Sequence, residues 1–127
     1  MKIIKIISLL LIAFMGFQSC YYDVEEELYP TKTGCDTSNV TLLVKVKPIL
    51  QKSCYTCHAQ ANFATLGAGI NLESYPGIKT QVDNGKLLKS INHAAGASAM
   101  PKGSTLKIDA CEIKIIEKWV RNGALDN

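Results

Sequence analysis

The sequence is constrained most strongly by one short run, Cys54-Tyr55-Thr56-Cys57-His58. Its two thiols lie one helical turn apart if the run is helical, and an imidazole follows the second thiol directly. A pair of thiols at this spacing can bind a metal, form a local disulfide or attach a cofactor covalently. Other features of the sequence are needed to choose among these three uses.

The histidine beside the second cysteine favours covalent attachment of haem. The two thiols would add across neighbouring vinyl groups of the porphyrin, and His58 would supply the proximal ligand of the iron. A redox pair of the thioredoxin type would follow a strand in a βαβ unit, and no such pattern precedes this run. A structural zinc site would need a fourth ligand, such as His93, and a local disulfide would leave His58 without a role. We therefore predict one haem c on Cys54 and Cys57, with His58 as an axial iron ligand.

Met100 is predicted to be the second axial ligand. It lies in the run Ala99-Met100-Pro101-Lys102-Gly103, where proline and glycine can hold a loop that presents the thioether to the iron. A thioether opposite an imidazole favours Fe(II) and raises the reduction potential, which suits an electron carrier. His93 is the alternative ligand and would give bis-histidine coordination with a lower potential. Met100 could instead be a gap-filling core methionine. A distal site that neither residue occupies, open to small ligands, is the remaining alternative.

The N-terminal segment is typical of an exported lipoprotein. Lys2 and Lys5 precede an apolar run over residues 6–17, which is shorter than the roughly 20 residues of a transmembrane helix. The following Phe17-Gln18-Ser19-Cys20 resembles a bacterial lipobox, in which the cysteine is lipidated and becomes the new N-terminus. We therefore expect a lipoprotein signal peptide over residues 1–19, with a retained membrane anchor as the alternative.

Residues 20–34 are expected to form a lipidated tether in front of the globular domain. This stretch contains an acidic cluster, Pro30 and Gly34, which favour a solvated spacer over a core segment. Acyl chains on Cys20 would hold the protein on a membrane. We expect an exported protein, lipid-anchored at the cell envelope on the periplasmic face or the outer-membrane surface.

Helical patterns dominate the rest of the chain, and no segment has the pattern of a strand. An apolar stretch over residues 40–53 predicts a helix that reaches Ser53, and Pro48 leaves its start open. Short helices are expected at residues 75–82 and 87–93. The sequence therefore predicts an all-α fold.

The last helix has the clearest signals. Asp109 and Glu112 have the spacing of a capping box, in which each side chain bonds to the backbone of the other residue. Gly123 marks the end of the helix after about four turns. Four apolar residues between these signals follow at helical spacing: Ile113, Ile116, Trp119 and Val120.

Together the haem-binding run, the Met100-Pro101 loop and the C-terminal helix resemble a class I cytochrome c over residues 40–125. More narrowly, the chain is similar to small monohaem lipoproteins of Bacteroidetes-type bacteria. The resemblance implies a small all-α domain over residues 35–127, whose first and last helices cross and clamp one covalently bound haem. It also implies that Ile116 and Trp119 pack against the haem or at the helix crossing. No proline closely follows His58, unlike in many class I members, so the resemblance assigns no hydrogen-bond partner to that imidazole.

Two cysteines remain once Cys20 carries lipid and the haem-binding pair is assigned. These are Cys35 and Cys111, and thiols that can pair in an exported protein usually do so. We therefore predict a disulfide between the start of the domain and the first turn of the last helix. Two buried free thiols are the alternative.

The predicted function is electron transfer by a membrane-anchored cytochrome that is not itself an enzyme, with an unidentified redox protein as partner. An open distal site would instead suit a sensor or a peroxidase-like enzyme, and a structural zinc or disulfide module is the other alternative. The net charge of +3 is too weak, and no basic run is interleaved with aromatic residues, so nucleic acid is not expected as a partner. Seven lysines are candidates for docking an acidic partner, or simply solubilise the surface: Lys45, Lys47, Lys52, Lys79, Lys86, Lys89 and Lys102.

Overall fold

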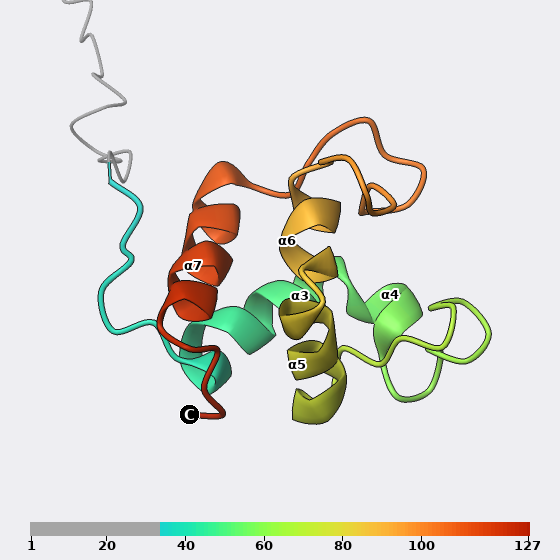
Figure 1. The fold of residues 1–127 in the computed structure, drawn as a ribbon, viewed down its shortest axis with the longest axis horizontal. Coiled ribbons are helices and arrows are strands. Elements are labelled where there is room, and N and C mark those ends of the chain that lie inside the picture. Colours follow the sequence, from blue (N-terminus) through green and yellow to red (C-terminus); the bar gives the residue numbers. More distant parts are fainter. Residues whose placement is uncertain (1–33) are drawn as a thin grey trace, which may run out of the picture. The chain divides into compact units, whose positions relative to one another are not determined.

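Six helical segments form within residues 34–127, the part of the chain that this computed structural model describes (Figure 1). In chain order they are η1 (Leu42–Val46), α3 (Lys47–Ser53), α4 (Tyr55–His58), α5 (Tyr75–Asp83), α6 (Lys86–Ile91) and α7 (Ala110–Arg121). No strand occurs among the described residues, so the all-α prediction is confirmed for them. None of these helices is long and apolar enough to cross a membrane. The predicted signal peptide, Cys20 and the tether up to residue 33 lie outside the described residues.

The helix predicted to end at Ser53 does so, and it begins at Leu42 with a π-helical turn. Thr41 caps it, because its side-chain oxygen accepts the backbone N–H of Val44 at 3.3 Å. Pro48 lies in the first turn of α3, directly after the wider π-turn. Inside a regular helix, a proline removes an N–H donor and its ring clashes with the carbonyl four residues before it. A first helical turn that follows a π-turn is therefore the position in this segment where a proline is tolerated best.

Ser74 marks the start of α5, and a tight turn at Gly85 separates α5 from α6. Ser74 caps α5 by accepting the backbone N–H of Gly77 at 3.3 Å. Gly85 then adopts a φ of 70°, a left-handed conformation that glycine takes without strain. The sequence predicted that the next helix reaches residue 93, and this is wrong, because α6 ends at Ile91. His93 has a φ of 51°, which no right-handed helix accommodates.

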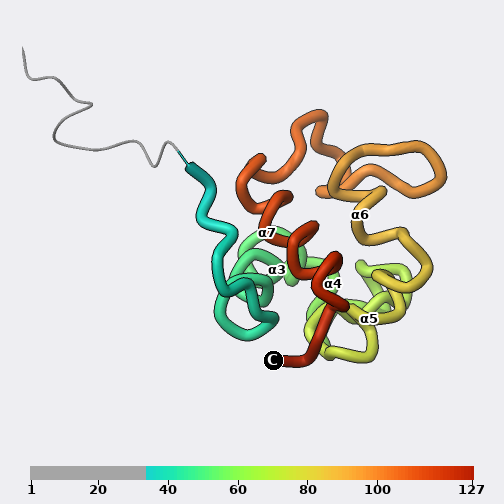
Figure 2. The backbone as a smooth tube through the Cα atoms, turned by 60° about the vertical axis from the view of Figure 1, so that its left-hand side comes forward, coloured from blue at the N-terminus to red at the C-terminus, as the bar shows by residue number. Residues whose placement is uncertain are grey.

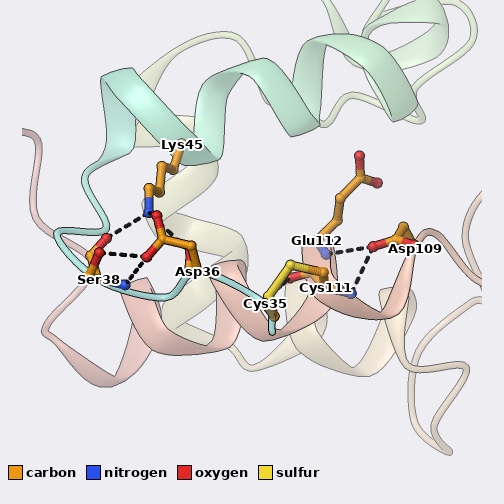
Figure 3. Close-up of a disulfide and its surroundings, with 7 residues drawn as sticks. All are labelled: Cys35, Asp36, Ser38, Lys45, Asp109, Cys111 and Glu112. Carbon is orange, nitrogen blue, oxygen red and sulfur yellow. Dashed lines mark hydrogen bonds and ion pairs between the residues drawn. A yellow bond between two sulfur atoms is a disulfide. The ribbon is translucent and has the colours of Figure 1, made fainter. Parts of the chain in front are cut away.

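Helix α7 confirms the predicted C-terminal helix and one half of its capping box. Asp109 accepts the backbone N–H of Cys111 at 2.8 Å and that of Glu112 at 3.2 Å (Figure 3). The reciprocal half is not formed, because the Glu112 carboxylate accepts from Nζ of Lys52 at 2.8 Å instead. This ion pair joins α7 to α3. The helix ends before Gly123, whose φ is 97°.

The buried hydrophobic core takes side chains from η1, α3, α5, α6 and α7, and the partly buried Tyr55 of α4 packs against it. Helix α7 contacts both η1 and α6, and it lies beside the η1–α3 segment in both views (Figures 1 and 2). The first and last helices are therefore in contact, and the core holds α3 in a fixed place just before the cysteine motif. Among residues 34–127 the largest fully buried side chains contribute roughly 1.5–3 kcal/mol each: Trp119, Leu42, Leu50, Ile78, Ile116 and Val46.

A disulfide joins the segment before η1 to the first turn of α7 (Figure 3). It is formed by Cys35 and Cys111, as the sequence predicts. Their Sγ atoms lie 2.03 Å apart and their Cα atoms lie 5.2 Å apart. The neighbouring Asp36 accepts from Nζ of Lys45 at 2.7 Å and from the backbone N–H of Ser38 at 2.9 Å. These bonds, that from Lys45 above all, hold the pKa of the Asp36 carboxyl well below its usual range.

Candidate haem site

The cysteine motif forms one helical turn directly after α3. The backbone N–H of Cys54 bonds to the carbonyl of Leu50 at 2.8 Å, and Cys54 is the one residue between α3 and α4 (Figure 1). The carbonyl of Cys54 then accepts the backbone N–H of Cys57 at 3.1 Å and that of His58 at 2.9 Å. Both cysteines therefore start from the same turn, as attachment to neighbouring vinyl groups of one porphyrin requires.

The two thiols of this turn are not bonded to each other, and each is half-buried. Burial raises the pKa of the Cys54 thiol to about 11, and the Glu112 carboxylate adds to the shift. Such a thiol carries little thiolate at neutral pH, whereas the attacking cysteine of a redox-active pair has a lowered pKa. The environment of Cys54 thus disfavours thiol–disulfide exchange as its role.

The imidazole of His58 is buried and held in one orientation by the backbone. Its Nδ1 lies 2.9 Å from the carbonyl oxygen of Ile70, and its side chain is 9% exposed. Because a carbonyl can only accept, Nδ1 must carry the proton, and Nε2 then keeps its lone pair. This is the tautomer that binds a metal through Nε2. Ile70 is therefore the hydrogen-bond partner that sequence reasoning left unassigned.

A close approach at Gly67 shapes the loop that carries Ile70. A Cβ atom on Gly67 would lie 2.6 Å from the carbonyl oxygen of Cys57 and 2.9 Å from Nδ1 of His58. The loop also returns to α4 through the backbone N–H of Leu72, which bonds to the carbonyl of His58 at 2.9 Å. Only a glycine lets the chain pass so near the imidazole, and no sequence pattern predicts this contact.

Met100 is held at the end of α6 through both of its backbone groups. Its N–H bonds to the carbonyl of Ser90 at 3.1 Å, and its own carbonyl accepts from Nε2 of His93 at 2.9 Å. While the second bond stands, Nε2 of His93 carries its proton and has no lone pair for a metal. In this geometry Nδ1 is the only ring nitrogen that His93 could offer to a metal.

These residues fit a covalently bound haem c. Two unpaired thiols share one turn, one imidazole keeps Nε2 available, and a thioether lies in a loop held by α6. An imidazole and a thioether are standard axial ligands of a cytochrome c. In Figure 1 the loop over residues 59–74 and the loop over residues 92–109 both extend to the right of the helices.

The two residues expected to pack on the haem or at the helix crossing lie in the core. Ile116 is 0% exposed and Trp119 is 1% exposed. The indole Nε1 of Trp119 donates to the carbonyl of Leu125 at 2.9 Å, which satisfies its polar group. Their burial on α7 agrees with packing where the first and last helices meet, and packing against the haem stays a prediction.

Three of the seven candidate docking lysines already form ion pairs within residues 34–127. The pairs are Lys45 with Asp36, Lys52 with Glu112 and Lys79 with Asp83. Each pair has at least one exposed partner and adds little stability, but each carboxylate offsets the positive charge beside it. A docking surface for an acidic partner would therefore depend on the other four lysines.

No protein-family model, curated protein or solved structure matches this chain. Within the described part of the chain, no three histidine, cysteine, aspartate or glutamate side chains group closely enough to suggest a metal site. Haem attachment and the zinc alternative both stay predictions, which the experiments below separate.

Proposed function

We propose that this protein is a membrane-anchored monohaem c-type cytochrome that passes electrons between partner proteins and catalyses no reaction itself. One observation carries the proposal. The motif turn presents two unpaired thiols, and His58 follows with Nδ1 bonded to the carbonyl of Ile70, so that Nε2 is available to iron.

The haem, when bound, supplies an iron that takes up and gives back one electron. The chain supplies a site that changes little between the two states, because buried side chains hold α3 and the motif turn that follows it. The Ile70 carbonyl fixes the ring orientation of His58 and increases the basicity of its Nε2. Burial of the same imidazole limits the access of water to it.

Met100 is the second axial ligand in this proposal. Its thioether is a soft ligand that favours the reduced iron, so the reduction potential is higher than bis-histidine coordination would give. The hydrogen bond that occupies Nε2 of His93 supports this choice. Such a potential suits a carrier that accepts an electron from one protein and donates it to another.

Production of the full-length chain in a bacterium with periplasmic cytochrome c maturation tests the cofactor. We expect a covalent haem, seen as added mass and as a reduced-minus-oxidised spectrum that survives denaturation. The Cys54→Ser/Cys57→Ser double variant should lose the haem. The Cys35→Ser/Cys111→Ser variant also removes two cysteines and should keep the haem, which makes it the matched control. A colourless wild-type protein that binds one equivalent of zinc would favour the zinc alternative and end the proposal.

The same preparations test the axial ligand. The oxidised wild-type protein should show a sulfur–iron charge-transfer band, and Met100→Ala should abolish it. Persistence of the band in that variant would show that another group binds the iron. A wild-type spectrum without the band, together with fast binding of cyanide or carbon monoxide, would support the open distal site of a sensor or peroxidase-like enzyme.

The membrane anchor in this proposal is a lipid on Cys20, outside the described residues. Lipidation requires the cysteine side chain, so Cys20→Ser should move the haem protein from the membrane fraction to the soluble periplasmic fraction. Lys2→Gln, which leaves the cysteine in place, serves as the control. A Cys20→Ser protein that still sediments with membranes would contradict lipid anchoring and favour a retained apolar anchor.

A further inference from the structure

Three hydrogen bonds join Met100, His93 and the end of α6, and two of them are made by Met100 itself. The carbonyl of Ser90 accepts the backbone N–H of His93 at 3.2 Å and that of Met100 at 3.1 Å. The side chain of His93 then reaches across, and its Nε2 donates to the carbonyl of Met100 at 2.9 Å. We call these three bonds the Met100 clamp. It fixes the Met100 backbone on both its N–H and its carbonyl side.

The segment between His93 and Met100 is too small and too exposed to fix the methionine by packing. It reads Ala-Ala-Gly-Ala-Ser-Ala over residues 94–99, and nearly all of it is exposed. Alanine, glycine and serine bury little apolar area, so such a segment opens easily. The position of Met100 therefore depends on the clamp.

His93 itself has a backbone conformation that needs support from its surroundings. Its φ of 51° lies in the left-handed region, which is unfavourable for a residue with a side chain. Strained residues of this kind persist where neighbouring contacts hold them, and they are frequent at ligand-binding sites. Here the strained backbone directs the imidazole toward the Met100 carbonyl.

We propose that His93 is a positioning residue for the axial methionine and not an iron ligand. Its protonated Nε2 holds the Met100 carbonyl, and the Ser90 carbonyl holds the Met100 N–H, so the thioether is presented from a fixed backbone. This inference deepens the proposed cytochrome function and rests on it. It gives a separate role to the one histidine that the haem-binding motif does not include.

Loss of the His93 side chain should weaken the iron–thioether bond without removing the haem. The loop gains freedom, Met100 leaves the iron more often, and an added ligand competes better for the open position. One lost hydrogen bond of ~1 kcal/mol corresponds to about fivefold tighter binding of imidazole by the oxidised protein. Glutamine in place of His93 keeps an N–H donor and should restore most of the wild-type affinity.

The test uses the full-length haem-loaded protein and the variants His93→Ala, His93→Gln and Met100→Ala, with Ser98→Ala as the control in the same exposed segment. The measurements are the imidazole dissociation constant of the oxidised form, the sulfur–iron band and the hydrogen exchange rate of the Met100 amide. We expect His93→Ala to bind imidazole about fivefold more tightly, to lose part of the band and to exchange the Met100 amide faster. His93→Gln and Ser98→Ala should resemble the wild type.

Two results would overturn the role of His93. One is a His93→Ala protein whose imidazole affinity and Met100 amide exchange stay within twofold of the wild type. The other is a His93→Ala protein that loses its second axial ligand completely while Met100→Ala keeps it, since His93 would then be the ligand. Failure of the proposed function looks different, because the wild-type chain itself would then carry no covalent haem, and that result would overturn both.

Discussion

Replacing Gly67 by alanine should distort the candidate haem site through a single added methyl group. A Cβ at this position would meet the carbonyl oxygen of Cys57 at 2.6 Å, Nδ1 of His58 at 2.9 Å and the Cα of Phe63 at 2.9 Å. Two of these atoms belong to the backbone, and the third is the ring nitrogen bonded to Ile70. None is the end of a flexible side chain, so the loop has to move away from the motif turn.

The expected cost has two parts. Overpacking at a tight position destabilises a protein by roughly 1–3 kcal/mol. A buried Nδ1–H that loses the Ile70 carbonyl costs roughly another 1–3 kcal/mol, because the donor is left without a partner. We therefore expect Gly67→Ala to lower the free energy of unfolding by about 2–6 kcal/mol, a large part of the stability of a small domain.

Gly69→Ala is the matched control, two residues further along the same loop. Nothing lies within 4 Å of a Cβ placed there, but the φ of +78° makes the conformation unfavourable for alanine. This backbone effect alone costs about 1–2 kcal/mol. Denaturant unfolding of the haem-loaded protein, followed by circular dichroism, compares the two variants. The reasoning is refuted if Gly67→Ala is no less stable than Gly69→Ala.

Three further predictions concern the framework around the site. Cys35→Ser/Cys111→Ser opens a loop of sequence separation 76 and should lower the free energy of unfolding by about 4 kcal/mol, measured by denaturant unfolding; an unchanged midpoint would contradict it. The pKa of Asp36 is lowered in the folded protein, so the ionised carboxylate stabilises the fold above the unfolded pKa of about 3.9, and this contribution is lost as the pH falls below that value. Asp36→Asn should therefore flatten the pH dependence of the free energy of unfolding below about pH 4. An NMR titration of Asp36 with an ordinary midpoint would refute this. Asp109→Ala removes the cap of α7 and should cost about 0.5–2 kcal/mol in thermal or denaturant unfolding, whereas Asp126→Ala should change stability little.

Local signals in the sequence predicted most of the helices. Asp109 caps α7 as expected, and the first helix reaches Ser53, because capping and hydrophobic periodicity depend on neighbours in the chain. Two details depended on tertiary contacts and could not be predicted. Glu112 pairs with Lys52 of α3 in place of the Asp109 backbone, and α6 ends early because residues 90–100 form their own hydrogen bonds.

The candidate site also has some features that the sequence predicted and others that it could not predict. Its side chains could be named from the sequence, because thiols and imidazoles are rare and their spacing carries chemical meaning. Its backbone contacts could not be named, since every residue has a carbonyl and only the path of the loop selects Ile70 as the partner of His58. Gly67 was missed for a related reason, because its role comes from a close approach and not from a turn conformation.

The two histidines of the chain show how the backbone separates chemically identical groups. A carbonyl faces Nδ1 of His58, whereas a carbonyl faces Nε2 of His93. Since each carbonyl forces the nitrogen it meets to carry the proton, the two rings are held in opposite tautomers. In the proposed cytochrome, His58 can therefore offer Nε2 to the iron, while His93 has only Nδ1 left and lies on a strained backbone with a φ of 51°. The proposal that His58 binds the iron and that His93 positions Met100 is consistent with these two tautomers.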